Sequence, residues 1–186
     1  MQTASKVDIP GHRAPAVGLD SPFEMLQACH ERVNQSLALM QRLQLYLREK
    51  GLDGDARQAA RDVMRYFDMA APLHHQDEEL HVFPPLLQGL DASLHTVIHQ
   101  LMDDHRVMET RWATARAALN RIAECDISDW TALTPEQTQA LTGFASLYAR
   151  HIADEEEVVS PAARACMAPT AVEGMSQDMM RRRGAS

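Results

Sequence analysis

Histidine and glutamate recur together at a metal-binding spacing in this 186-residue sequence. Residues 74–79 and 151–156 both read HxxxEE, lie 77 residues apart, and have a proline ten residues after the first histidine. A histidine and a glutamate four residues apart lie one turn apart on the same face of a helix. Neutral imidazole and carboxylate together suit iron, manganese or zinc. The repeat therefore predicts a metal site that Glu78 and Glu155 face.

Two more histidines, His30 and His105, are 75 residues apart and extend this repeat. Four of the nine histidines lie on apolar helical stripes, at offsets of three, four, seven, eight or eleven residues. The stripes are His30 with Phe23, Leu26, Val33 and Leu37; His74 with Val63, Phe67, Ala70 and Val82; His105 with Ile98, Leu101, Met108 and Trp112; and His151 with Phe144, Leu147, Val158 and Ala162. An unpaired buried polar group costs about 1–3 kcal/mol, so four core-facing imidazoles require a common partner.

The elements that carry these histidines are four predicted helices. They begin at Ser21-Pro22, at Asp53 or Asp55, at Asp91 or Ser93, and at the capping box 134–137, and they end near residues 50, 90, 125 and 166. Proline at 72, 84, 85 and 161 is expected to kink them. We predict an all-α fold: an antiparallel up-down-up-down four-helix bundle over residues 21–166, with an irregular lead-in at 1–20 and a loose tail at 167–186.

In such a bundle the four histidines fall at one level. His30 and His74 each lie about 20 residues from the first turn, which is about 30 Å along the axis. His105 and His151 agree within one or two turns. We therefore predict two ions bridged by Glu78 and Glu155, with open positions for a small ligand such as O2, NO or peroxide, because six side chains cannot saturate two octahedral ions.

A rival register pairs His75 with Glu79. Its face continues through Asp68 and Arg61, which are poor core residues, so His74 with Glu78 is favoured and His75 stays an additional candidate ligand. The remaining acidic residues of these runs, Glu79, Glu156 and Glu157, are interpreted as solvated.

Several other residues near the predicted site have less specific interpretations. Cys29 is read as a small buried hydrophobe rather than a thiolate ligand. Asp104 and Asp154 adjoin ligand histidines and are candidates to orient them. Tyr148 either packs in the core or lines the pocket. The remaining histidines, at positions 12, 81, 95 and 99, are interpreted as surface or supporting residues.

Composition excludes several classes of protein. The net charge of −8 argues against nucleic-acid binding, and no stretch approaches the ~20 apolar residues that a membrane-spanning helix needs. The first 20 residues contain no apolar segment typical of a secretory signal. Three cysteines without a CxxC pair argue against a disulfide framework. A cytoplasmic protein is expected.

At these residues the sequence resembles the hemerythrin-like HHE cation-binding domains. The resemblance covers roughly residues 22–165. It rests on Cys29-His30-Glu31-Arg32, His74-His75-x-x-Glu78-Glu79 with Phe83-Pro84, Asp104-His105, and His151-x-x-x-Glu155-Glu156. It implies a four-helix bundle with two iron ions joined by an oxo or hydroxo bridge, manganese or zinc being alternatives. The ligands it implies are His30, His74, Glu78, His105, His151 and Glu155.

One position departs from the oxygen-carrying members of that family. They have a further histidine one turn from the ligand of the third helix, whereas Leu101 and Glu109 stand here. Glu109 is therefore either a seventh ligand or a solvated residue near the pocket mouth. The leading hypothesis is a di-iron protein that binds O2, NO or peroxide in sensing or stress defence. The alternatives are a di-iron peroxidase, oxidase or iron–sulfur repair enzyme, and a structural-metal or storage protein.

Overall fold

The computed structural model describes residues 21–184, and this part of the chain is helical with no strand. The predicted lead-in at 1–20 lies outside the described residues. The helices are α1 (Pro22–Lys50), α2 (Gly54–Asp77), α3 (Phe83–Leu87), α4 (Ala92–Glu124), α5 (Pro135–Ala145), α6 (Tyr148–Asp154), α7 (Ser160–Cys166) and α8 (Pro169–Arg182). Two π-helical turns, η1 (Glu78–Val82) and η3 (Glu155–Val159), and a 3₁₀ turn, η2 (Ile127–Asp129), complete the order.

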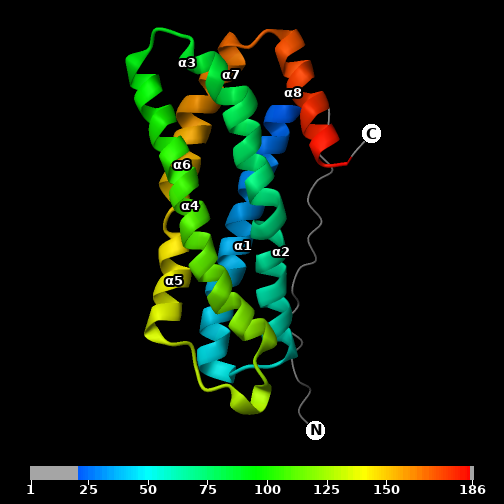
Figure 1. Cartoon of the computed structure of the whole chain (residues 1–186), viewed down its shortest axis with the longest axis vertical. Coiled ribbons are helices and arrows are strands. Elements are labelled where there is room, and N and C mark those ends of the chain that lie inside the picture. The colour runs from blue at the N-terminus through cyan, green and yellow to red at the C-terminus, as the bar shows by residue number, and fades with distance from the viewer. Residues whose placement is uncertain (1–20, 185–186) are drawn as a thin grey trace.

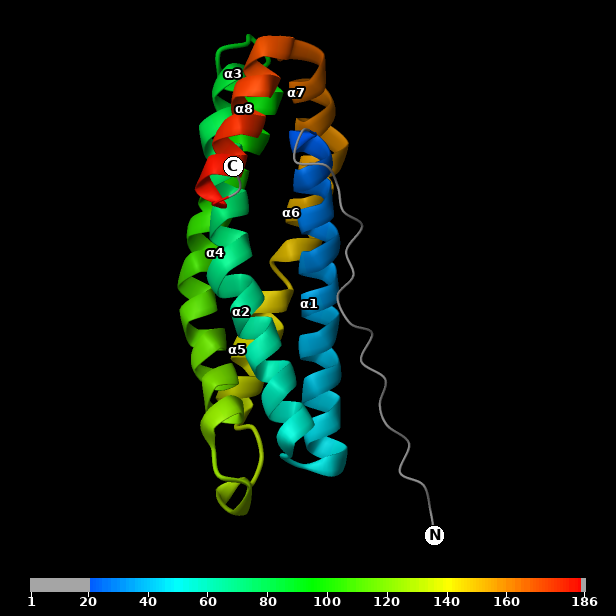
Figure 2. The same ribbon diagram turned by 90° about the vertical axis from the view of Figure 1, so that its right-hand side faces the viewer.

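Successive elements line up into long rods that run side by side (Figure 1). The chain descends along α1, ascends through α2, η1 and α3, descends along α4 and ascends again from α5 to α7 (Figures 1 and 2). Neighbouring rods pack in the pairs α1 with α2, α2 with α4, and α4 with α5. The predicted all-helical bundle is thus confirmed.

The helix ends follow the local signals in the sequence. Gly51 ends α1 with a φ of 79°, a conformation that glycine adopts without strain. The Asp53 side chain caps α2 by accepting from the Ala56 amide, and Asp91 caps α4 by accepting from the Ser93 and Leu94 amides. Thr134 and Gln137 form the predicted capping box.

The fourth rod is not the single helix that was predicted. It breaks at Ser146–Leu147, where the Ser146 hydroxyl donates a hydrogen bond to the Gly143 carbonyl oxygen at 2.9 Å. A side chain that bonds to nearby backbone in this way competes with the helical pattern.

The C-terminal segment corrects a second expectation. Residues 169–182 form α8 rather than a loose tail, and this helix packs against α1 and α2 near the end of the bundle (Figure 1). Met175 and Met179 of α8 are completely buried in the apolar cluster there. These methionines are four positions apart in the sequence, which places them on one face of the helix.

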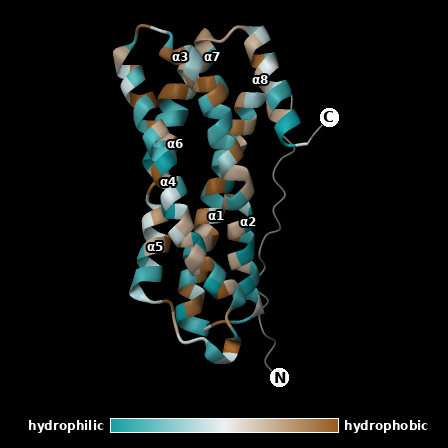
Figure 3. Ribbon diagram, viewed as in Figure 1, coloured by the Kyte–Doolittle hydropathy of each residue, from teal (hydrophilic) through white to brown (hydrophobic). Residues whose placement is uncertain are grey.

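Two separate apolar clusters form the core of the bundle. One lies toward the α1–α2 turn and includes Met40, Val63 and Leu119; the other includes Phe83, Ile98 and Met175. Along each rod, hydrophobic and hydrophilic residues alternate as amphipathic helices require (Figure 3). The level between the clusters is occupied by the buried histidines and glutamates.

Candidate metal centre

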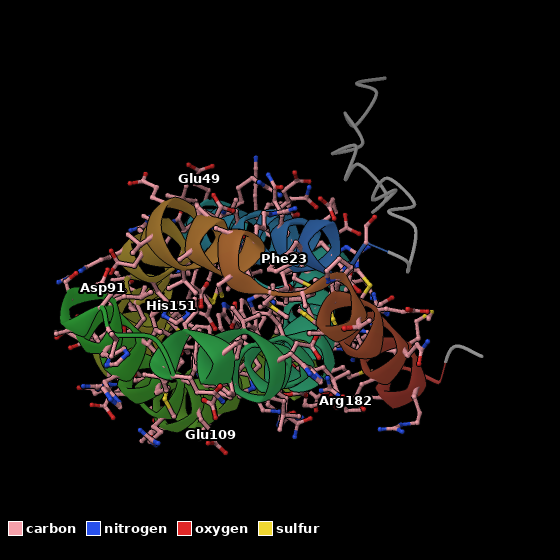
Figure 4. All side chains as sticks on the ribbon, turned by 90° about the horizontal axis from the view of Figure 1, so that it is seen from above. Phe23, Glu49, Asp91, Glu109, His151 and Arg182 are labelled. Atoms are coloured by element: carbon pink, nitrogen blue, oxygen red, sulfur yellow. The ribbon has the colours of Figure 1, made fainter. Side chains whose placement is uncertain are left out.

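The six residues proposed as ligands meet at this level. Each has no more than 5% of its surface exposed, and they come from six different elements, namely His30 (α1), His74 (α2), Glu78 (η1), His105 (α4), His151 (α6) and Glu155 (η3). Figure 4 looks along the bundle and shows His151 between the helices and Glu109 at the periphery.

The potential ligand atoms fall into two groups. The first group consists of His30, His74, Glu78 and Glu155, and the second of His75, His105 and His151; within each, one ligand atom per residue lies within 4.8 Å of the others. Glu155 touches both groups: Oε2 lies 3.0 Å from His30 Nε2 and Oε1 lies 2.9 Å from His151 Nε2. Glu78 also touches both groups: Oε1 lies 3.4 Å from His74 Nε2 and Oε2 lies 3.5 Å from His105 Nε2.

His75 belongs to the second group, although it is one residue out of phase with the apolar stripe. Its ring stacks on that of His105, with centroids 3.9 Å apart and planes 9° apart. Both residues of the His74-His75 pair therefore reach the layer, from adjacent positions near the end of α2. The rival pairing of His75 with Glu79 is not formed, because Glu79 turns to His105.

The two π-helical turns explain how the glutamates are placed. Each begins at a glutamate of the HxxxE motif and ends just before the residue preceding Pro84 or Pro161. The Phe83 amide donates to the Glu78 carbonyl and the Ser160 amide to the Glu155 carbonyl, both five residues back. A wide turn accommodates a proline that has no amide hydrogen to donate.

The wide turn also advances the helix phase by one residue. Val158 was predicted in the core and is 39% exposed, whereas Val159 is only 2% exposed and takes its place. The stripe prediction was therefore wrong at Val158, because it assumed an unbroken 3.6-residue period.

A second correction concerns Glu79 and Glu156, which were interpreted as solvated. Glu156 Oε1 lies 2.9 Å from His30 Nδ1, and Glu79 Oε1 lies 2.9 Å from His105 Nδ1. These positions are related by the same internal repeat. A carboxylate that accepts the second ring N–H fixes both the tautomer and the orientation of a ligating imidazole. The repeated Glu-Glu doublet was the sequence signal for this role.

Of the other candidate residues near the histidines, only some contact the site. Asp104 Oδ2 lies 3.6 Å from His151 Nδ1, whereas Asp154 pairs with Arg150 instead. Glu109 is exposed and outside both groups. Cys29 is buried but also outside both groups, and burial raises the pKa of its thiol.

Buried polar atoms without hydrogen bonds support a metal at this level. They include the Nε2 atoms of His105 and His151, Oε2 of Glu78 and both carboxylate oxygens of Glu155, whose close contacts with one another lack hydrogen-bond geometry. Such atoms are rare in folded proteins and costly to bury, unless an ion or water completes them. Imidazole nitrogens and carboxylate oxygens suit iron, manganese or zinc, so these residues fit a pair of such ions.

The protonation states suit metal binding as well. Burial and the neighbouring His30 lower the pKa of His74 to about 3, and burial holds the pKa of His75 well below its usual value. Both rings are therefore neutral and offer lone pairs. Burial, together with the charge of Glu155, holds the pKa of Glu78 well above its usual range.

Glu155 has the opposite shift. Burial alone would raise its pKa, but the close contacts of its carboxylate with His105, His151 and His30 outweigh burial and hold the pKa well below its usual value. For His30, burial alone would lower the pKa of the imidazole, but the contacts with Glu155 and Glu156 outweigh burial and raise it. The metal-free centre thus carries a charged Glu155 among imidazoles.

Helix α8 contributes to the surroundings of the site. Asp77, one residue before Glu78, is completely buried and accepts hydrogen bonds from Arg182 and Arg183. His81 of η1 contacts Asp178 of α8 at 2.8 Å. These contacts hold the end of α2 and the η1 turn against the C-terminal segment, and the sequence alone did not indicate them because the partners are about 100 residues apart.

Two pockets reach the two groups from different directions. The carboxylate pocket, of about 470 Å³, is lined by His30, Glu78, Glu155, Glu156, Glu157 and Arg164 among others. The aromatic pocket, of about 290 Å³, is lined by Phe67, His75, His105, Glu109, Trp112 and Tyr148 among others. Tyr148 is buried and contributes both to the core and to this pocket.

Comparison with known proteins agrees with this geometry. The Hemerythrin HHE cation binding domain matches residues 21–163. The chain belongs to the hemerythrin HHE family. It is also 30% identical over 164 residues to an uncharacterized protein of Haemophilus influenzae. The aligned segment covers 88% of this chain and 91% of the relative. As a hemerythrin HHE domain with a buried His/Glu cluster, the protein is assigned to metal binding. Within residues 21–184, no helix is apolar over enough of its length to cross a membrane.

Proposed function

We propose that this hemerythrin HHE protein holds two iron ions and binds a small ligand, O2, NO or peroxide, in sensing or in the response to oxidative or nitrosative stress. The observation that carries the proposal is the contact of Glu78 and Glu155 with both ligand groups. A carboxylate with an oxygen directed to each group is suited to bridging two ions. We take the four rods as an antiparallel up-down-up-down bundle to which α8 is added.

The ligand assignment follows the two groups. His30 and His74 would hold one ion, and His105 and His151 the other, with His75 as a further ligand of the second ion. His75 would then supply from α2 the histidine that oxygen carriers place on the third helix. When bound, two iron ions with an oxo or hydroxo bridge supply reversible binding and reduction of such ligands. Manganese and zinc fit the same donors.

The asymmetry of the groups supports a position for the small ligand at the first ion. The first group offers two imidazoles and the second offers three, so the first ion keeps more open positions. His30, Glu78 and Glu155 of that group line the carboxylate pocket, through which a ligand would enter. Glu156 and Glu79 would hold the rings of His30 and His105 in their ligating tautomers.

An optical titration tests this proposal. Protein reconstituted with Fe²⁺ and oxidised in air is expected to show a charge-transfer band that shifts on addition of azide, peroxide or NO. Zn²⁺-loaded protein, which has no such band, is the control. A band that none of the three ligands shifts would favour structural ions. Consumption of peroxide over many turnovers would favour the enzyme alternative, and we expect a cytoplasmic protein in either case.

A further inference from the structure

The carboxylate pocket carries acidic side chains from its rim to its floor. Glu157 and Glu156 are exposed at the rim, while Glu155 and Glu78 are each 3% exposed at the floor. Glu157 forms no ion pair with any residue that the structure describes, so its charge is free to act on an approaching ion. The buried oxygens Glu78 Oε2 and Glu155 Oε2 accept no hydrogen bond, although Glu155 Oε2 lies 3.0 Å from His30 Nε2, and both glutamates line the pocket.

Among the described residues that line this pocket, Arg164 is the one arginine or lysine, and its charge is already paired. Arg164 donates a hydrogen bond to Glu24 Oε1 at 3.0 Å and lies over the Phe23 ring, 4.6 Å from its centroid. Its charge is therefore paired outside the row of carboxylates and opposes entry of a cation only weakly.

The aromatic pocket differs in its lining. Phe67, Trp112, Phe144 and Tyr148 form a connected ring cluster, with centroids 5.0–5.7 Å apart. Its two glutamates, Glu79 and Glu109, share the lining with Arg106, and Glu79 is already engaged with His105 Nδ1. A hydrated divalent ion on this path would meet fewer free carboxylates and would exchange water for aromatic surface, which is unfavourable.

We propose that the carboxylate pocket is the entrance by which divalent cations load the centre, with Glu157 as the residue that attracts them. The ion passes from Glu157 and Glu156 to Glu155 and Glu78, meeting a carboxyl group at each stage. A line of like charges in a low-dielectric cleft raises the local concentration of counter-ions and their association rate. This inference rests on the proposed metal centre but concerns the rate of loading rather than the final occupancy.

The test measures Co²⁺ uptake by metal-free protein in stopped flow, following the absorption of the bound ion. Glu157→Lys is expected to slow loading roughly fivefold to tenfold at about 10 mM ionic strength, and to have little effect at about 0.5 M salt. The final absorbance should equal that of the wild type, because Glu157 is not a ligand. Arg164→Gln should speed loading up to about threefold.

Two charge-matched variants separate this entrance from other effects. Glu109→Lys changes the same charge beside the aromatic pocket, and Glu49→Lys changes it on an exposed position of α1 outside both pockets. Both should load at the wild-type rate. The proposed entrance would be overturned, with the metal centre left intact, by any of three results. These are slower loading of Glu109→Lys, slowing of Glu49→Lys equal to that of Glu157→Lys, and loading of Glu157→Lys at the wild-type rate. Absence of Co²⁺ uptake by the wild type would overturn both.

Discussion

Replacing Arg182 and Arg183 together by glutamine should strongly destabilise the metal-free protein. The Asp77 carboxylate has no exposed surface, and these two arginines, each 17–20% exposed, are the cations paired with it. Removing the partners of a buried charge costs about 3–5 kcal/mol, and the partial exposure of the arginines favours the lower end. We expect a loss of about 3 kcal/mol for the double variant, and about 1–2 kcal/mol for each single variant, since the remaining arginine still pairs.

The assay is equilibrium urea unfolding, with Arg181→Gln as the matched control. Arg181 belongs to the same run, but its side chain is 80% exposed, so its loss should change stability by less than about 1 kcal/mol. Adding Asp77→Asn to the double variant removes the stranded charge and should restore at least about 1 kcal/mol. A double variant as stable as Arg181→Gln, or a triple variant no more stable than the double, would refute this reasoning.

Three further predictions concern the site and its surroundings. His74→Ala should remove the first ion and lower total metal content more than His75→Ala, measured as metal per chain; the reverse order would favour the pairing of His75 with Glu79. The contact with His81 lowers the pKa of Asp178 to about 2, below its value of about 3.9 in unfolded chains. Asp178 should therefore stabilise the fold above about pH 4 and lose this effect as the pH falls toward 2. The difference in free energy of unfolding between wild type and Asp178→Asn, measured by urea unfolding, should shrink over that pH range. A constant difference would contradict a stabilising role for the charged Asp178. Glu157→Gln should bind azide, an anion, about twofold to threefold more tightly in optical titration, with NO affinity unchanged; equal changes for both would contradict a charge effect.

Much of the fold and the site could be predicted because the repeat is local and strong. The HxxxE motif fixes a histidine and a glutamate on one helix face, and short turns fix the level at which the helices meet. Periodicity failed at Val158 because a π-helical turn inserts one extra residue per turn, and the signal for that turn, Pro161, was interpreted only as a kink.

The remaining features depend on contacts between distant parts of the chain. Glu79 reaches the histidine of α4 and Glu156 that of α1, so their roles cannot be deduced from neighbours on their own helices. Helix α8 is attached by the pairing of Arg182 and Arg183 with Asp77, about 100 residues earlier. His75 reaches the centre because the end of α2 directs two adjacent imidazoles into one layer, which a single-stripe description does not allow.

The most direct test of the proposed centre is the iron content of each chain after anaerobic reconstitution and removal of loosely bound metal. We predict two iron ions per wild-type chain, and near-complete loss in Glu155→Ala, since this carboxylate contacts both ligand groups. Glu109→Ala should retain two ions. One iron or fewer in the wild type, or full loading of Glu155→Ala, would contradict a centre of two ions bridged by carboxylates.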